Sequence, residues 1–257
     1  PMSLCRSGEI PPGSDASSAP GVENSPRTIP QHALVWALRI REHYELYGER
    51  DFVAEVYPAL RRLLRWCQRH TNQHGLLDEL PSWNWLDWSN LDLRGASFAT
   101  NAIYMKILRD ASYLASVVGA ADEGRQWDEQ AERVAGSLRK LFWSGEKGIY
   151  WDSLIDDRPT GRISEHSNYL ALLYGLAGPD RGSSIMKAVL APPPEMARIS
   201  PNFFLYLEYA LAAENRIPEM LRIIRERFSE MYRSGFDTVW EHWTFNGRLT
   251  PINSIRE

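Results

Sequence analysis

Hydrophobic residues along the chain alternate between two kinds of helical pattern. Residues 31–48 are apolar on most sides and end at Gly48, whereas 51–67 repeat apolar residues every three or four positions, opposite a face with arginines. The couplet returns three times, with further all-round apolar segments at 98–118, 166–177 and 203–213. A helix that is apolar on all sides is buried on all sides, whereas an amphipathic helix lies at the surface.

This alternation predicts an all-α protein of eight helices in four hairpins, with an inner ring wrapped by an outer ring. A solenoid of helical repeats is the main structural alternative. However, the couplets begin near residues 30, 97, 165 and 202, so the period is irregular, and no common repeat signature is present. Convincing strand patterns are scarce. We therefore expect a toroid of helical hairpins.

The loops fall into two classes by length. Connections from an all-round apolar helix to its amphipathic partner are short, at 48–51, 119–124 and 177–180. The return connections are long and rich in Trp, Asp and Glu, at 71–96 and 143–165, with 234–248 after the last helix. In an alternating double ring all the long loops lie on one face. Long loops that carry such residues on a rigid scaffold predict the functional face.

The first long loop carries an aspartate among three tryptophans. Trp83, Trp85 and Trp88 surround Asp87 within residues 82–92. Tryptophan faces stack on the apolar side of a pyranose ring, while a carboxylate accepts hydrogen bonds from sugar hydroxyls. The alternative is a loop anchored by its tryptophans, in which Asp87 caps the following helix. This loop is a candidate sugar site.

The second long loop ends in three polar residues at the start of a buried helix. The aspartates within 149–157 suit ordinary turns. Ser164 and Glu165 have the pattern of a helix N-cap followed by a first-turn acid. His166 begins the helix on the face that carries the other long loops, so both a binding role and a structural role remain open for this residue.

The third long loop carries the strongest candidate for acid–base chemistry. Glu241 lies between Trp240 and His242, with Trp243 next. A carboxylate among aromatic rings is desolvated, which raises its pKa and suits it to general acid–base catalysis. The alternative is a buried glutamate that pairs with an arginine.

The composition argues against several classes of function, namely nucleic-acid binding, membrane spanning and metal or nucleotide binding. The 257 residues carry a formal net charge of −4, which gives no reason to expect a nucleic acid or an anionic membrane as partner. No apolar run approaches the ~20 residues of a bilayer span. Two cysteines and six scattered histidines give no metal-ligand spacing, and no nucleotide-binding or zinc-protease motif occurs. We expect no metal and no cofactor, and the ten tryptophans favour a sugar ligand.

Four segments, in this order, resemble the bacterial α-L-rhamnosidases of glycoside hydrolase family 78. They are residues 28–66, GLLDELPSWNWLDW (75–88), SPNFFLYLEYAL (200–211) and GFDTVWEHW (235–243). The resemblance covers nearly the whole chain. It implies an (α/α)6 six-hairpin toroid, of which about eight of the twelve helices are present. It also implies inverting hydrolysis of terminal α-L-rhamnose from a rhamnose-containing glycoside or polysaccharide.

The resemblance also implies roles for particular residues. Glu241 matches the general base of the T-x-W-E segment, and Asp87 matches the loop that lines the rhamnose pocket. The tryptophans Trp83, Trp85 and Trp88 match the same loop. With His166 and Trp240 from the other two long loops, the candidate substrate-binding residues are Asp87, Trp83, Trp85, Trp88, Trp240 and His166.

The sequence departs from the family pattern in two places. The general acid of the family lies in a D-x-x-x-R-x-E motif followed by G-D, upstream of the Gly/Pro-rich segment, and no such motif occurs here. A family histidine about twenty residues beyond the W-E segment is also missing. We expect residues 1–257 to be one partial catalytic domain, truncated at both ends, irregular over 1–28 and inactive by itself.

Two other functions remain open at this point. Other six-hairpin hydrolases, of the glucoamylase, trehalase or debranching type, share the toroid and its aromatic loops. A non-catalytic helical toroid that binds glycans or proteins is the second alternative, in which Glu241 is expendable.

Overall fold

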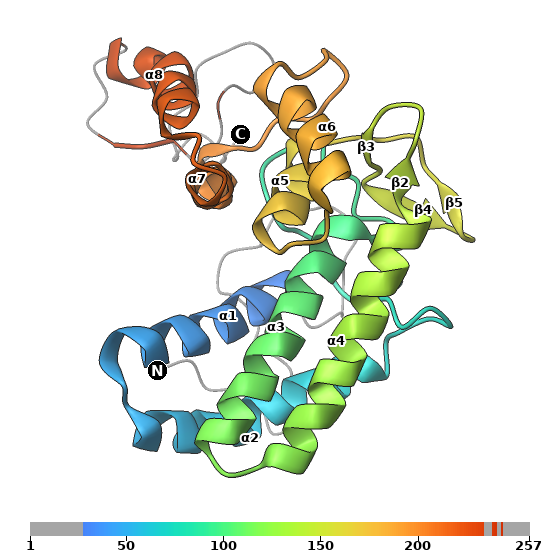
Figure 1. Cartoon of the computed structure of the whole chain (residues 1–257), viewed down its shortest axis with the longest axis vertical. Coiled ribbons are helices and arrows are strands. Elements are labelled where there is room, and N and C mark those ends of the chain that lie inside the picture. The colour runs from blue at the N-terminus through green and yellow to red at the C-terminus, as the bar shows by residue number, and fades with distance from the viewer. Residues whose placement is uncertain (1–27, 234–237, 241–242, 244–257) are drawn as a thin grey trace. The chain divides into compact units, whose positions relative to one another are not determined.

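The computed structural model describes residues 28–233, 238–240 and 243, and within them eight α-helices dominate over five short strands (Figure 1). The elements are α1 (Pro30–Tyr47), α2 (Arg50–Gln68), β1 (Ala96–Ser97), α3 (Phe98–Val117), α4 (Ala121–Leu141), β2 (Trp143–Ser144), β3 (Ile149–Tyr150), β4 (Ser153–Ile155), β5 (Arg158–Pro159), α5 (Glu165–Leu173), α6 (Pro179–Leu190), the 3₁₀ helix η1 (Pro201–Phe203), α7 (Phe204–Ala213) and α8 (Ile217–Arg233). The predicted helical fold and the predicted helix count are confirmed for the described residues.

The described chain divides into two compact units. The described residues up to Leu86, together with Leu93–Phe142 and Ser153–Arg158, form the first unit. Asp87–Asp92, Trp143–Asp152 and the described residues from Pro159 onward form the second. The expectation of a single partial catalytic domain stays a prediction.

Burial separates the two helices of the second and third hairpins as the hydrophobic pattern predicts. In the first unit 14 of the 20 residues of α3 are buried, against 7 of the 21 residues of α4. In the second unit 8 of the 9 residues of α5 are buried, against 3 of the 12 residues of α6. The first helix of each of these two pairs is therefore a core element, and the second packs through one face only. The first pair shows no such contrast, since 7 of the 18 residues of α1 and 6 of the 19 residues of α2 are buried. The expectation that residues 31–48 are buried on all sides is therefore wrong. None of the described helices combines the length and the apolar character that a bilayer span needs.

Local signals at the helix ends explain several of the boundaries. Gly48 ends α1 in the left-handed region at φ 68°, and its N–H donates to the Tyr44 carbonyl at 2.8 Å. Ser97 caps α3 and Ser164 caps α5 through their side-chain oxygens, as expected for Ser164. Helix α5 is shorter than the apolar run 166–177, because the chain turns at Gly175 with φ 66°.

A short antiparallel pairing in the first unit requires a glycine. Strand β1 pairs with β4 in the register Ala96–Leu154, and Gly95 precedes it with φ 59°. A Cβ at Gly95 would lie 2.2 Å from the Leu154 carbonyl oxygen. Only glycine permits this close approach of the two backbones.

Asn101, one turn into α3, fixes the loop that precedes this helix. Its Oδ1 accepts the Leu77 N–H at 2.7 Å, and its Nδ2 donates to the carbonyls of Leu77 at 3.0 Å and Ser97 at 2.8 Å. The side chain is fully buried, so it replaces water for three backbone groups.

Asn168 makes the same three bonds one turn into α5. Its Oδ1 accepts the Tyr150 N–H at 2.9 Å, and its Nδ2 donates to the carbonyls of Tyr150 at 3.2 Å and Ser164 at 2.9 Å. An asparagine four residues after the serine cap thus bonds each of the loops 71–96 and 143–165 to the first turn of the buried helix that follows it.

Candidate functional site

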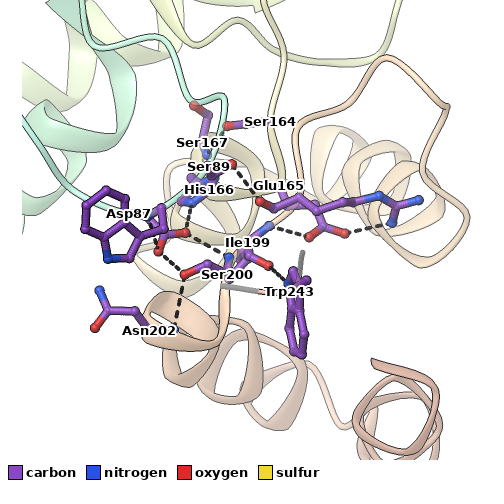
Figure 2. Close-up of polar contacts among 12 residues, drawn as sticks. Asp87, Ser89, Ser164, Glu165, His166, Ser167, Ile199, Ser200, Asn202 and Trp243 are labelled. Atoms are coloured by element: carbon purple, nitrogen blue, oxygen red, sulfur yellow. Dashed lines mark hydrogen bonds and ion pairs between the residues drawn. The ribbon is translucent and has the colours of Figure 1, made fainter. Parts of the chain in front are cut away.

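Asp87 is the hub of a buried hydrogen-bond network in the second unit (Figure 2). Its Oδ1 accepts the Trp88 N–H at 2.9 Å and the Ser200 hydroxyl. Its Oδ2 accepts the Ser200 N–H at 2.9 Å and the His166 Nε2–H at 2.6 Å. A carboxylate offers about four acceptor positions, and here all four are occupied. The network therefore ties the loop 87–92 to α5 and to the residue that caps η1.

His166 donates to this network from the first turn of α5. Both the His166 ring and the Asp87 side chain are fully buried. A carboxylate accepts hydrogen bonds, so the short contact places a proton on Nε2 of the imidazole. The ring also packs against Phe203, with 5.0 Å between the centroids, and its Nδ1 has no hydrogen-bond partner within the described residues.

Asp152 lies on the second long loop and is also buried. Its Oδ1 accepts the hydroxyls of Ser164 at 2.6 Å and Ser167 at 2.8 Å. Burial raises the pKa of the Asp152 carboxyl, and the two serine bonds and the nearby His166 act in the opposite direction. The residue therefore supports the N-cap of α5, beyond the turn role expected from the sequence.

Glu165 is a fully buried carboxylate clamped by two arginines. Arg227 bonds to it through both terminal nitrogens, at 2.8 Å and 2.5 Å, and Arg198 adds a third contact at 3.0 Å. The Ile199 N–H also donates to Glu165, at 2.9 Å. The predicted first-turn position of Glu165 is confirmed. Its arginine partners lie 33 and 62 residues away, so the local pattern gave no signal for them.

A cavity of about 430 Å³ opens beside these arginines in the second unit. Its charged and aromatic lining consists of Arg198, Arg222, Arg227, Glu226, Trp240 and Trp243. Trp240 is buried, and the indole N–H of Trp243 donates to the Ile199 carbonyl at 2.5 Å (Figure 2). Glu241, the predicted base, lies outside the described residues.

Two of the candidate tryptophans belong to the first unit. Trp83 is exposed and Trp85 is half-buried, with 6.2 Å between their ring centroids, and His32 meets Trp85 edge-on at 5.3 Å. Trp88 is half-buried and belongs to the second unit with Asp87. The alternative in which Asp87 caps the next helix is wrong, because that helix is α3 and its cap is Ser97.

Possible metal ligands do not cluster in the described part of the chain. Nowhere in it do three or more His, Cys, Asp or Glu side chains gather in a way that could hold an ion. Cys67 is free and buried, and burial raises the pKa of its thiol.

Comparison with known proteins identifies the family. A model of the bacterial alpha-L-rhamnosidase six-hairpin glycosidase domain matches residues 4–254. The chain belongs to this family. The predicted resemblance is thereby confirmed, and so is the six-hairpin helical class of the fold.

Solved structures of rhamnosidases share the fold of this family member. The family 78 rhamnosidase of Bacillus sp. GL1 is 30% identical with a TM-score of 0.79, over 87% of this chain and 24% of the Bacillus chain. A rhamnosidase from Klebsiella oxytoca with rhamnose bound is 17% identical with a TM-score of 0.76, over 93% of this chain and 45% of its own. The chain therefore spans less than half the length of either enzyme.

A curated relative of different activity also matches part of the chain. The N,N'-diacetylchitobiose phosphorylase of Vibrio proteolyticus is 28% identical over 144 residues, which are 53% of this chain and 18% of the phosphorylase. Part of this chain is thus similar in sequence to a protein named as a phosphorylase.

Proposed function

We propose that the protein containing this chain hydrolyses terminal α-L-rhamnose from glycosides or polysaccharides, with inversion at the anomeric carbon. The family match over residues 4–254 carries this proposal, and the similarity to the Bacillus rhamnosidase supports it. Inverting hydrolysis needs a carboxylic acid that protonates the leaving oxygen and a carboxylate that activates water, about 6.5–9.5 Å apart.

In this proposal Glu241 is the general base. Its position in the T-x-W-E segment supports the role, as do the contacts of its neighbours. Trp240 is buried and Trp243 is bonded to the Ile199 carbonyl, so the described residues on both sides of Glu241 are anchored. The general acid is not assigned to a residue of this sequence, because the D-x-x-x-R-x-E motif of the family does not occur in it.

Asp87 and His166 contribute to the rhamnose site by positioning rather than by direct contact. A substrate hydroxyl could bond to Asp87 only by displacing one of its four present donors. The Asp87 network instead holds the Trp88 backbone, and we propose that the Trp88 ring stacks on the sugar. Trp83 and Trp85 remain candidates for stacking on the resemblance alone.

The proposal is tested by the hydrolysis of p-nitrophenyl α-L-rhamnoside beside the corresponding α-D-glucoside. We expect cleavage of the rhamnoside alone, with β-L-rhamnose as the first product in ¹H NMR spectra, because the reaction inverts the configuration. Cleavage of the glucoside alone would point to another six-hairpin glycosidase. Cleavage of neither would favour the non-catalytic binding toroid.

The phosphorylase relative favours one further alternative, phosphorolysis. In that reaction inorganic phosphate replaces water, so a sugar 1-phosphate forms only when phosphate is added. Equal rates with and without phosphate, and free rhamnose as the product, are the outcome that hydrolysis predicts.

A further inference from the structure

The cavity beside Glu165 concentrates positive charge in an acidic chain. Three arginines and one glutamate line it, and the buried Glu165 pairs with two of these arginines. Three positive and two negative charges leave one net positive charge, whereas the whole sequence has a net charge of −4. Its volume of about 430 Å³ lies within the range of small-ligand sites, about 300–1,000 Å³. A concave surface lined mainly by one sign of charge attracts ligands of the opposite sign.

The arginines of this cavity are held in place before any ligand arrives. The buried Glu165 fixes Arg227 by two bonds and Arg198 by one. Each guanidinium therefore loses less conformational freedom when it binds an anion than a freely rotating side chain would.

Arg222 lines the cavity and has hydrogen-bond donors that no described residue occupies. Only its Nη1 is engaged, in two bonds of 2.8 Å to the Glu226 carboxylate, and it makes no other hydrogen bond to any described residue. Its side chain is 48% exposed, so its remaining nitrogens are accessible to a ligand. The planar fork of a guanidinium matches the two oxygens of a carboxylate.

We infer that this cavity binds a sugar unit that carries a carboxylate, that is, a uronic acid. The guanidinium groups take the carboxylate, and the indole ring of Trp243 contributes an apolar surface for the pyranose. The inference rests on the proposed function to this extent: the uronic acid is part of the same rhamnose-containing saccharide. Trp240 and Trp243 line the cavity, and they lie one residue before and two residues after the proposed base in the sequence.

The experiment is a calorimetric titration of the 257-residue chain with a methyl uronoside, the matching neutral methyl hexoside and inorganic phosphate. We expect the uronoside to bind at least about tenfold more tightly than the neutral sugar, because charge-assisted hydrogen bonds add to the shared ring contacts. The preference should shrink as salt is raised. Equal binding of the two sugars, or binding of neither, overturns the inference, and so does phosphate binding that matches the uronoside.

A matched pair of variants assigns the effect to the cavity. Arg222 and Arg216 both have 48% side-chain exposure, and each pairs with a glutamate three or four residues later, but only Arg222 lines the cavity. Arg222→Gln should lose the preference for the uronoside, whereas Arg216→Gln should keep it. Equal behaviour of the two variants contradicts the assignment.

The test separates this inference from the proposed function. Binding is measured without turnover, so a uronoside preference can stand even if the rhamnoside is not cleaved. Conversely, cleavage of the rhamnoside by a protein whose cavity ignores the uronoside would leave the hydrolase proposal intact and remove only the acidic-sugar site.

Discussion

Replacement of Glu165 by glutamine should destabilise the second unit far more than the same replacement at Glu226. Loss of one partner from a buried ion pair costs about 3–5 kcal/mol, because it leaves a charge without compensation. The side chain of Arg227 is 16% exposed and falls under this rule, whereas that of Arg198 is 44% exposed and contributes on the scale of a surface pair, about 0–1 kcal/mol. We therefore expect Glu165→Gln to lower the free energy of unfolding by about 3 kcal/mol.

Glu226 supplies the matched control. Its carboxylate also makes two bonds to one arginine, but its side chain is 57% exposed and the pair joins positions four apart on α8. Such a pair is worth about 0.3–0.5 kcal/mol, so Glu226→Gln should unfold nearly as the unaltered chain does.

The assay is urea unfolding followed by tryptophan fluorescence and by far-ultraviolet circular dichroism. Two probes are needed because the chain has two compact units, and a single unfolding energy requires coincident transitions. The double variant Glu165→Gln, Arg227→Met should recover part of the loss, since it removes the uncompensated guanidinium. Losses within 0.5 kcal/mol of each other for Glu165→Gln and Glu226→Gln would refute the reasoning.

Three further predictions concern the buried polar residues. Asp87→Ala leaves several buried donors without an acceptor and should cost at least about 3 kcal/mol in urea unfolding, and it should also slow cleavage of the rhamnoside; unchanged stability and rate would contradict its positioning role. Burial raises the pKa of Asp152, so the folded chain binds the proton of this carboxyl more tightly than the unfolded chain does. The protonated Asp152 therefore stabilises the fold at low pH, and this stabilisation is lost as pH rises from the ordinary pKa of 3.8 through the raised pKa. Asp152→Asn should therefore gain stability relative to the unaltered chain between pH 3.5 and pH 7, and an equal difference at both pH values would contradict this. Asn101→Ala and Asn168→Ala each remove three backbone bonds and should each cost about 2–3 kcal/mol; amide exchange should rise at Leu77 or at Tyr150 respectively, and unchanged exchange would refute the pinning role.

The periodicity of apolar residues predicts the helices, and it predicts the burial of α3 to α6 but not that of α1. The contrast between α3 and α4 is a direct result of it, because burial on all sides and burial on one face leave different patterns in the sequence. The end of α5 was placed too late, since the apolar run continues beyond Gly175 although the backbone has already turned. Apolar character marks burial, and a turn can be as buried as a helix.

The polar network of the site could be predicted only in part. Ser164 was predictable as a cap because its partner is local, whereas the bonds of Asp87 reach His166 and Ser200, 79 and 113 residues away. One signal was present and was missed: a serine cap followed four residues later by asparagine occurs twice, at 97–101 and 164–168.

The long-range ion pairs of Glu165 have no comparable signal in the sequence. Arg198 and Arg227 are two of many arginines in the sequence, and nothing in their neighbours marks them as partners of one buried glutamate. The position of the cavity follows from that pairing, so only the folded chain reveals it.

Whether Glu241 is the base of a rhamnosidase is tested most directly by one comparison. The rate of p-nitrophenyl α-L-rhamnoside hydrolysis is measured for the protein that contains this chain and for its Glu241→Gln variant, with L-rhamnose binding measured on both. Loss of the base should lower kcat by about 10²–10⁴-fold, while rhamnose binding persists because the shape of the side chain is retained. Turnover by Glu241→Gln at the unaltered rate would contradict the claim.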